Sequence, residues 1–220
     1  SNNMIASTAS FSAEDLAYMK HLFRAYQFHV RLGMLKYYLY HVQLEHGIPA
    51  IAFLRRWLDR VLEEDPALPI SNRVFKELLV DNVRAFDWAP ISWGKEARFF
   101  FDDLASYYHE IYRFSQREFK LTLTEGVLKT LVSAQDAVSP KLEREYPFSV
   151  ALTHNIETYF SQIKHAPSLH HMKEGFTPLV AFDASTLHVT PDVPRVEDIS
   201  YMYVGGHSDD WELPSALRFY

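Results

Sequence analysis

The sequence predicts a mainly α protein: a helical body of about six helices, followed by a small β-containing C-terminal segment and an extended arm. Its residues are 48% hydrophobic and 23% charged, enough apolar content to bury a globular core. Prolines are sparse early and frequent late, with 4 of the 11 in residues 1–135 and 7 in residues 136–220. We therefore expect a helical body over residues 1–165. Residues 166–220 should form a β-containing segment and an arm that packs on the body or on a neighbouring subunit.

A capping box predicts where the first helix begins. Ser12 is placed as its N-cap, Asp15 follows three residues later, and Phe11 can pack against Leu16. Glycine ends helices readily, and Gly47 comes before the first proline at position 49. The pattern predicts either one helix of roughly 33 residues or two helices joined by a kink near Gly33.

Five further helices are predicted from capping residues, prolines and apolar spacing. Ser71 is expected to cap the second of them, and Thr122 with Glu125 forms the capping box of the fourth. Their expected ranges are residues 50–64, 71–86, 93–119, 122–138 and 148–164.

The pattern changes after residue 165, where short β-like stretches occur at residues 177–182, 185–190 and 199–204. Two or three strands do not form a stable domain alone. These strands must therefore pack on the helical body or pair with another chain.

Composition excludes several classes of protein and site. With no Cys, the chain has no disulfide, no cysteine-containing zinc site, no iron–sulfur cluster and no thiol nucleophile, as expected in a reducing compartment. No apolar run reaches the length of a membrane span, and the first ten residues lack the features of a signal peptide. We expect a soluble protein, with the cytoplasm as its compartment.

Motifs for nucleophilic catalysis and for nucleotide binding are absent from the sequence. There is no Gly-x-Ser-x-Gly turn and no glycine-rich phosphate loop. A catalytic triad assembled from distant residues stays open at this stage. The sequence thus favours a protein without enzymatic activity or a cofactor.

Histidines and carboxylates suggest a weaker alternative, a metal site. His41 and Glu45 are four residues apart and share a helix face, whereas His46 diverges from His41 by about 140°. A metal site could also form from an irregular set on several helices, although no Glu-x-x-His pair is present. The simpler interpretation is a polar helix end before Gly47. The candidate ligands are His41, Glu45, His109, Glu110 and His154.

Basic residues form two groups on the predicted helices. Lys20, Arg24 and Arg31 fall on one face of the first helix and could follow the phosphates of RNA. A second group lies on the following helix, where ion pairs with nearby carboxylates are the simpler interpretation. It consists of Arg55, Arg56 and Arg60, with Asp59, Glu63 and Glu64 as the nearby carboxylates. Residues 136–220 have 6 basic and 12 acidic residues and could dock on these bases.

Aromatic residues make up 15% of the chain, which fits either an aromatic-rich core or a protein–protein interface. In the predicted arm, residues 191–220, rings are too numerous for a solvated tail, so we expect the arm to be bound. The predicted interface residues are Tyr201, Tyr203, Trp211, Phe219 and Tyr220.

Residues 26–40 and 100–112, both rich in Tyr and Phe, together with the proline-bearing arm, resemble capsid proteins of partitivirus-type double-stranded RNA viruses. The resemblance implies a helix-rich shell subunit that associates as dimers, with a virion as the alternative location to the cytoplasm. Our leading hypothesis is therefore a non-enzymatic structural protein that assembles into a homo-oligomer, with a viral coat as one such assembly. The alternatives are a helical-bundle metalloenzyme, with a di-iron or similar site, and a helical adaptor that binds one protein partner.

Overall fold

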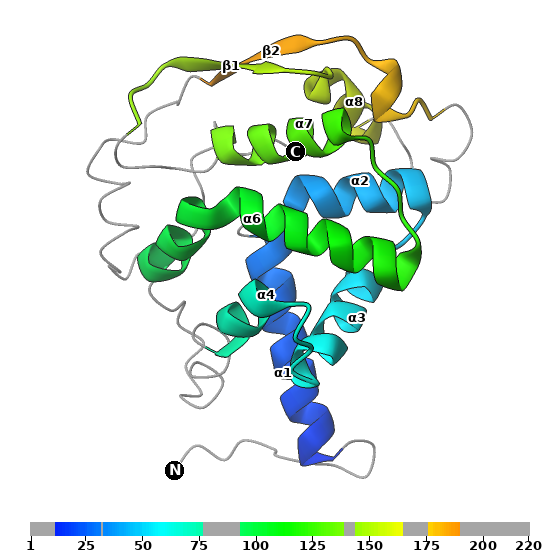
Figure 1. The fold of residues 1–220 in the computed structure, drawn as a ribbon, viewed down its shortest axis with the longest axis vertical. Helices are drawn as coiled ribbons and strands as arrows, with labels where there is room; N and C mark the ends of the chain where they lie inside the picture. Colours follow the sequence, from blue (N-terminus) through cyan, green and yellow to red (C-terminus); the bar gives the residue numbers. More distant parts are fainter. Residues whose placement is uncertain (1–11, 32, 77–92, 139–143, 165–175, 190–220) are drawn as a thin grey trace.

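A computed structural model describes residues 12–31, 33–76, 93–138, 144–164 and 176–189 of the chain. Within these ranges it has seven α-helices and one two-stranded antiparallel sheet, so the mainly α prediction is confirmed. Figure 1 shows the sheet lying over α7 and α8, with α2, α3, α4 and α6 gathered below them. Helix α1 extends furthest from the sheet.

The first predicted helix is two helices, as the kinked alternative proposed. Helix α1 (Ala13–Tyr26) begins with the predicted capping box: Asp15 N donates to Ser12 Oγ at 3.1 Å, and Ser12 N donates to Asp15 Oδ2 at 2.8 Å. A π-helical turn, η1 (Gln27–Arg31), follows, and Gly33 has a φ of 87°, which glycine adopts at little cost. Helix α2 (Lys36–His46) then ends at Gly47, as predicted.

Helices α3 (Ala50–Leu62), α6 (Trp93–Phe119) and α7 (Glu125–Val138) lie close to their predicted ranges. Backbone angles at Asp103 (φ −140°, ψ 27°) kink α6. The cap of α7 is Thr124 rather than Thr122, because Val127 N donates to Thr124 Oγ1 at 3.2 Å. Helix α4 (Pro69–Val74) begins before the predicted cap Ser71, since proline suits a first helical position. Residues 77–86 of that prediction lie outside the described residues.

The predicted helix over residues 148–164 is half wrong. Its first part is strand β1 (Phe148–Leu152), and only its second part is helical, α8 (Ile156–Lys164). Strand β1 pairs antiparallel with β2 (Ser185–Val189), with Phe148 opposite Val189 and Leu152 opposite Ser185. The sheet therefore joins residues on both sides of the predicted boundary at residue 165.

Two other strand predictions have different outcomes. Residues 177–182 were expected to be extended, but Leu179–Ala181 form a 3₁₀ turn, η4. The turn buries Leu179 and leaves Val180 53% exposed, so these residues pack as a turn rather than pairing in the sheet. The stretch at residues 199–204 lies outside the described residues.

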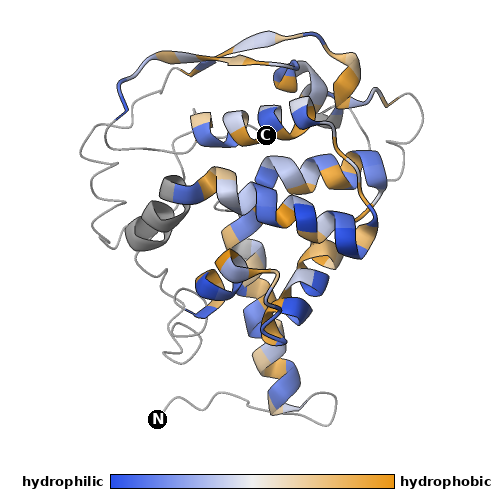
Figure 2. Ribbon diagram, viewed as in Figure 1, coloured by the Kyte–Doolittle hydropathy of each residue, from blue (hydrophilic) through white to orange (hydrophobic). Residues whose placement is uncertain are grey.

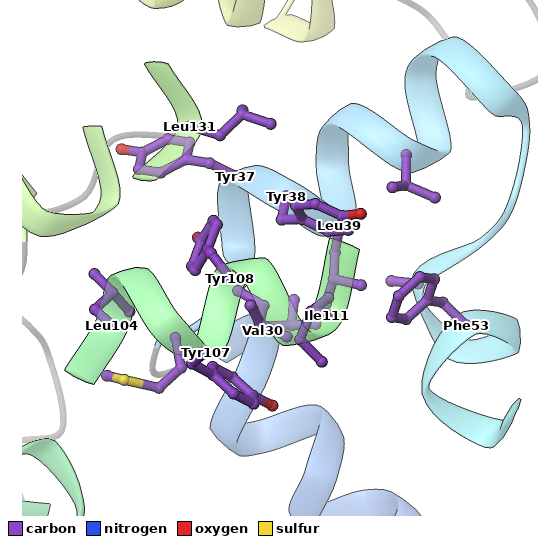
Figure 3. Packing of buried hydrophobic residues seen from close by; sticks show 14 of the residues in the cluster. Val30, Tyr37, Tyr38, Leu39, Phe53, Leu104, Tyr107, Tyr108, Ile111 and Leu131 are labelled. Atoms are coloured by element: carbon purple, nitrogen blue, oxygen red, sulfur yellow. The ribbon is translucent and has the colours of Figure 1, made fainter. Parts of the chain in front are cut away.

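Aromatic rings fill the core of the helical body. Tyr38 of α2 and Tyr108 of α6 meet edge to face with ring centroids 5.8 Å apart, as Figure 3 shows. Figure 2 shows hydrophobic and hydrophilic residues alternating along α1, α3 and α6, as in helices with one face in a core. The largest fully buried rings are those of Tyr38, Phe53, Trp57, Tyr107, Tyr108, Phe114 and Tyr159. For these rings, the aromatic-core interpretation is the correct one.

A buried carboxylate connects three of the helices. Glu110 of α6 is 0% exposed and accepts hydrogen bonds from Ile70 N at 2.8 Å, Ser71 N at 2.8 Å and Ser71 Oγ at 2.6 Å. Trp57 Nε1 of α3 donates to the same Ser71 hydroxyl at 2.9 Å. Glu110 thus satisfies backbone donors in the first turn of α4, which otherwise have no partner in their own helix.

His29 of η1 lies beside this network and is also fully buried. Its Nδ1 donates to the carbonyl of Ala25 at 2.8 Å, so Nε2 accepts from the Tyr107 hydroxyl at 2.6 Å. The Trp57 ring packs edge-on against it, with centroids 4.8 Å apart. Burial lowers the pKa of His29 to about 3, partly offset by the Ala25 hydrogen bond, and so the folded chain holds this ring neutral.

The substitution Glu110→Ala tests the role of the buried carboxylate. It leaves three donors without an acceptor, two of them buried and one part-buried, so the free energy of unfolding should fall by about 3–5 kcal/mol. Glu110→Gln keeps one acceptor oxygen and should cost less. Urea-induced unfolding measures both variants, with Glu145→Ala, an exposed position, as the control within about 0.5 kcal/mol of the unchanged chain. Equal costs for Glu110→Ala and Glu145→Ala would contradict this role.

His29 should make the chain sensitive to acid. Because its pKa is lowered from 6.5 to about 3, the unfolded chain binds the proton first as the pH falls below 6.5. The free energy of unfolding should then decrease by up to about 1.4 kcal/mol per pH unit from this residue until the pH approaches 3. Urea unfolding at several pH values should give a shallower slope for His29→Gln. The control His188→Gln, at an exposed position on β2, should keep the slope of the unchanged chain.

Candidate functional site

Three potential metal ligands meet at the C-terminal end of α2. His41, Glu45 and His46 each offer one ligand atom, and these atoms lie within 4.8 Å of one another. His41 is 2% exposed, Glu45 is 17% exposed, and His46 reaches the surface. Within the described ranges this is the one group of three or more histidine, aspartate or glutamate side chains that could share an ion.

Two other elements hold the Glu45 carboxylate and the His41 ring in place. The backbone N–H of Leu179, the first residue of η4, donates to Glu45 Oε1 at 2.7 Å. The hydroxyl of Tyr159 on α8 lies 3.1 Å from His41 Nδ1, which is itself 3.5 Å from Glu45 Oε1. The cluster therefore connects α2 with α8 and η4.

The surroundings of the cluster favour a neutral imidazole and a protonated phenol. Burial, with a smaller contribution from the neighbouring His46, lowers the pKa of His41 to about 3. Burial also raises the pKa of Tyr159, with the charge of Glu45 and a hydrogen bond to it acting in the same direction. At neutral pH His41 is thus a neutral imidazole, the form in which histidine binds metals.

Sequence spacing did not identify His46 as a member of this group. The angle of about 140° between His41 and His46 is that between their Cα–Cβ bonds around the helix axis. The imidazole nitrogens lie several bonds beyond Cβ, so side-chain torsions can bring them closer together than this angle suggests. The two imidazole rings are in fact near one another, with centroids 6.1 Å apart. His46 is also the last residue of α2, where no following helical turn limits its side chain.

The other predicted ligands lie elsewhere and do not join this cluster. Glu110 serves α4, and exposed His109 donates from Nδ1 to Ala105 O within its own helix at 2.8 Å. His154 Nδ1 lies 3.1 Å from Thr130 Oγ1 and 3.0 Å from Thr153 Oγ1. The irregular ligand set expected from sequence is therefore not assembled by the described residues.

Two arginines of α3 form ion pairs, and one of these pairs, Arg60 with Glu63, is among those that the simpler interpretation predicted. Arg60 Nη1 lies 2.8 Å from Glu63 Oε2, and both Arg56 and Arg60 contact Glu118 of α6 at 2.6 and 3.1 Å. Burial alone would raise the pKa of Glu118, but hydrogen bonds from Arg60, Arg117 and Arg56 lower it to about 2. These arginines hold α3 against the end of α6, a partnership that sequence spacing could not identify.

The predicted basic stripe does not follow a single α-helical face. Lys20 and Arg24 lie half-buried on α1, but Arg31 ends the π-helical turn η1. A π-helix has more residues per turn than an α-helix, so the backbone at Arg31 is displaced from the line that Lys20 and Arg24 define. The predicted interface residues of the arm, Tyr201, Tyr203, Trp211, Phe219 and Tyr220, lie outside the described residues.

Large apolar side chains are exposed on two neighbouring helices. On α1, Met19 and Phe23 are each 46% exposed, and on α3, Ile51 and Leu62 are each 45% exposed. The two helices pack together, and the Tyr18 hydroxyl of α1 donates to Asp59 Oδ1 of α3 at 2.7 Å. The sequence predicted an interface on the arm, whereas these exposed side chains on α1 and α3 were not predicted.

Comparison with protein-family models, with curated proteins and with solved structures finds no match to the chain. None of the helices in the described ranges combines the length and the apolar character needed to cross a membrane. The exposed apolar side chains and the α2 cluster are therefore the features from which a function is inferred.

Proposed function

We propose that this chain is a non-enzymatic structural protein that assembles with copies of itself. The observation that carries the proposal is the apolar surface of α1, the helix that extends furthest from the sheet in Figure 1. The resemblance of the sequence to partitivirus-type capsid proteins supports a coat-like shell as the form of the assembly.

Met19 and Phe23 are one helical turn apart and therefore lie next to one another on the surface of α1. Ala25 of the same helix is fully buried, so α1 already uses another face to pack on the body. Two large apolar side chains on a projecting helix favour contact with a further apolar surface, because each is 46% exposed and gains roughly 1 kcal/mol when its remaining surface is buried.

A second copy of α1 suits this surface. The helix has Glu14 and Asp15 in its first turn, and Lys20 and Arg24 in its second half. In an antiparallel pair related by a two-fold axis, the acidic turn of each helix lies beside the basic half of the other. The same two patches then meet twice, which closes a dimer.

The arm supplies a second contact in this proposal. Residues 191–220 include five aromatic residues and three prolines, a composition that fits binding to the chain's own body or to a neighbouring copy; the proposal takes the neighbouring copy. Dimers joined through α1 and linked by exchanged arms would extend the assembly beyond two copies.

The double substitution Met19→Ser and Phe23→Ser tests the α1 contact. Removing both apolar side chains from each copy should weaken association at least about 100-fold, since 1.4 kcal/mol corresponds to a tenfold change. Native mass spectrometry and light scattering at micromolar concentration measure the oligomer. Deleting residues 191–220 should reduce the assembly to dimers.

Val180→Ser is the matched control, because it removes an exposed apolar side chain from η4 instead of α1. The control should assemble like the unchanged chain. A monomeric unchanged chain at micromolar concentration would refute the proposed function, and full assembly of the α1 double variant would refute the α1 contact. A monomer that captures a different protein would support the adaptor alternative.

A further inference from the structure

We propose that His41, Glu45 and His46 bind one divalent transition-metal ion, with Zn²⁺ preferred, at the C-terminal end of α2. The proposal is independent of self-assembly and assigns the chain a second property. It rests on the type of the donors, on their separations and on the groups that hold them.

The donor set has the chemistry of a zinc site. Two imidazole nitrogens and one carboxylate oxygen are a common ligand set for Zn²⁺, which binds both at about 2.0–2.2 Å. Two such ligands on a tetrahedral ion lie about 3.3–3.5 Å apart. His41 Nδ1 and Glu45 Oε1 are already separated by 3.5 Å.

His46 completes the set with a small movement. The three ligand atoms lie within 4.8 Å of one another, so the last ligand must approach by roughly 1 Å to reach tetrahedral spacing. His46 is exposed at the helix end, whereas His41 is only 2% exposed. The buried ligand therefore fixes the position of the ion, and the exposed ligand closes on it.

The outer contacts of the cluster are those expected around a bound cation. Ligating carboxylates in proteins are themselves hydrogen-bonded, and here Leu179 N–H holds Glu45 Oε1 at 2.7 Å. The Tyr159 hydroxyl lies beside the same two ligands, 3.1 Å from His41 Nδ1. The carbonyl groups at the end of α2 add a negative potential that favours a cation.

Because Glu45 contacts η4 as well as the proposed ion, metal binding should stabilise the junction of α2 with η4 and α8. Three protein ligands also leave a coordination position open for an exogenous ligand, as in catalytic rather than closed structural zinc sites. The site would thus bind small anionic or neutral donors on the ion.

Calorimetric titration of the metal-free full-length chain with ZnCl₂ tests the proposal. We expect one Zn²⁺ per chain and a higher midpoint of thermal unfolding when Zn²⁺ is present. His46→Gln should weaken binding at least about tenfold, since even outer contacts of metal ligands contribute 10–100-fold. The exposed position of His46 makes this variant suitable, and circular dichroism checks its fold.

His109→Gln is the matched control, an exposed histidine on α6 away from the cluster. It should bind Zn²⁺ as tightly as the unchanged chain. Co²⁺ bound to the unchanged chain should show the visible absorption of a tetrahedral site, and His46→Gln should lose it. Failure of the unchanged chain to bind stoichiometric Zn²⁺ would overturn the proposal, as would equal affinity in the unchanged chain and in His46→Gln.

Discussion

The Glu110 carboxylate lies where α3, α4 and α6 meet, and it accepts three hydrogen bonds from the first two residues after Pro69. A buried carboxylate is stable only where hydrogen-bond donors compensate for its lost hydration. The first turn of α4 must therefore lie next to Glu110 of α6. Trp57 joins the same network through the Ser71 hydroxyl and thereby fixes α3 as well. The helical body is arranged around this requirement.

The aromatic core alone would leave helix positions less well defined, because rings pack acceptably in several offsets. Hydrogen bonds between buried polar atoms select among those offsets. His29 of η1 accepts a hydrogen bond from Tyr107 of α6, and Tyr38 of α2 donates to Ser115 Oγ of α6 at 2.8 Å. These bonds fix the positions of η1 and α2 along α6. With most described rings committed to this core, the large apolar side chains that remain exposed in the described ranges are those on α1 and α3, together with Val180 of η4.

The sequence predicted correctly those helix starts, ends and extents that depend on interactions between neighbouring residues. The capping box at Ser12, the stop at Gly47 and the extents of α3 and α6 depend on residues within a few positions of one another. Strand β1 was predicted as a helix because its partner, β2, lies more than thirty residues further along the chain. The ion pairs to Glu118, the capping role of Glu110 and the approach of His46 to His41 likewise depend on tertiary position or side-chain conformation.

Glu110, which is fully buried, and Glu45, which is 17% exposed, show how surroundings separate a structural carboxylate from a candidate ligand. Around Glu110 the neighbours are donors, two backbone N–H groups and a hydroxyl, which already supply the positive partial charge that the carboxylate needs. Around Glu45, one backbone N–H and the Tyr159 hydroxyl contact the carboxylate, and the imidazole nitrogens of His41 and His46 lie close to it. A carboxylate beside imidazole nitrogens can share a cation with them, whereas a carboxylate surrounded only by hydrogen-bond donors cannot. A metal ion at the end of α2 would therefore compensate the charge of the Glu45 carboxylate, whereas an ion at Glu110 would displace hydrogen bonds that already do so.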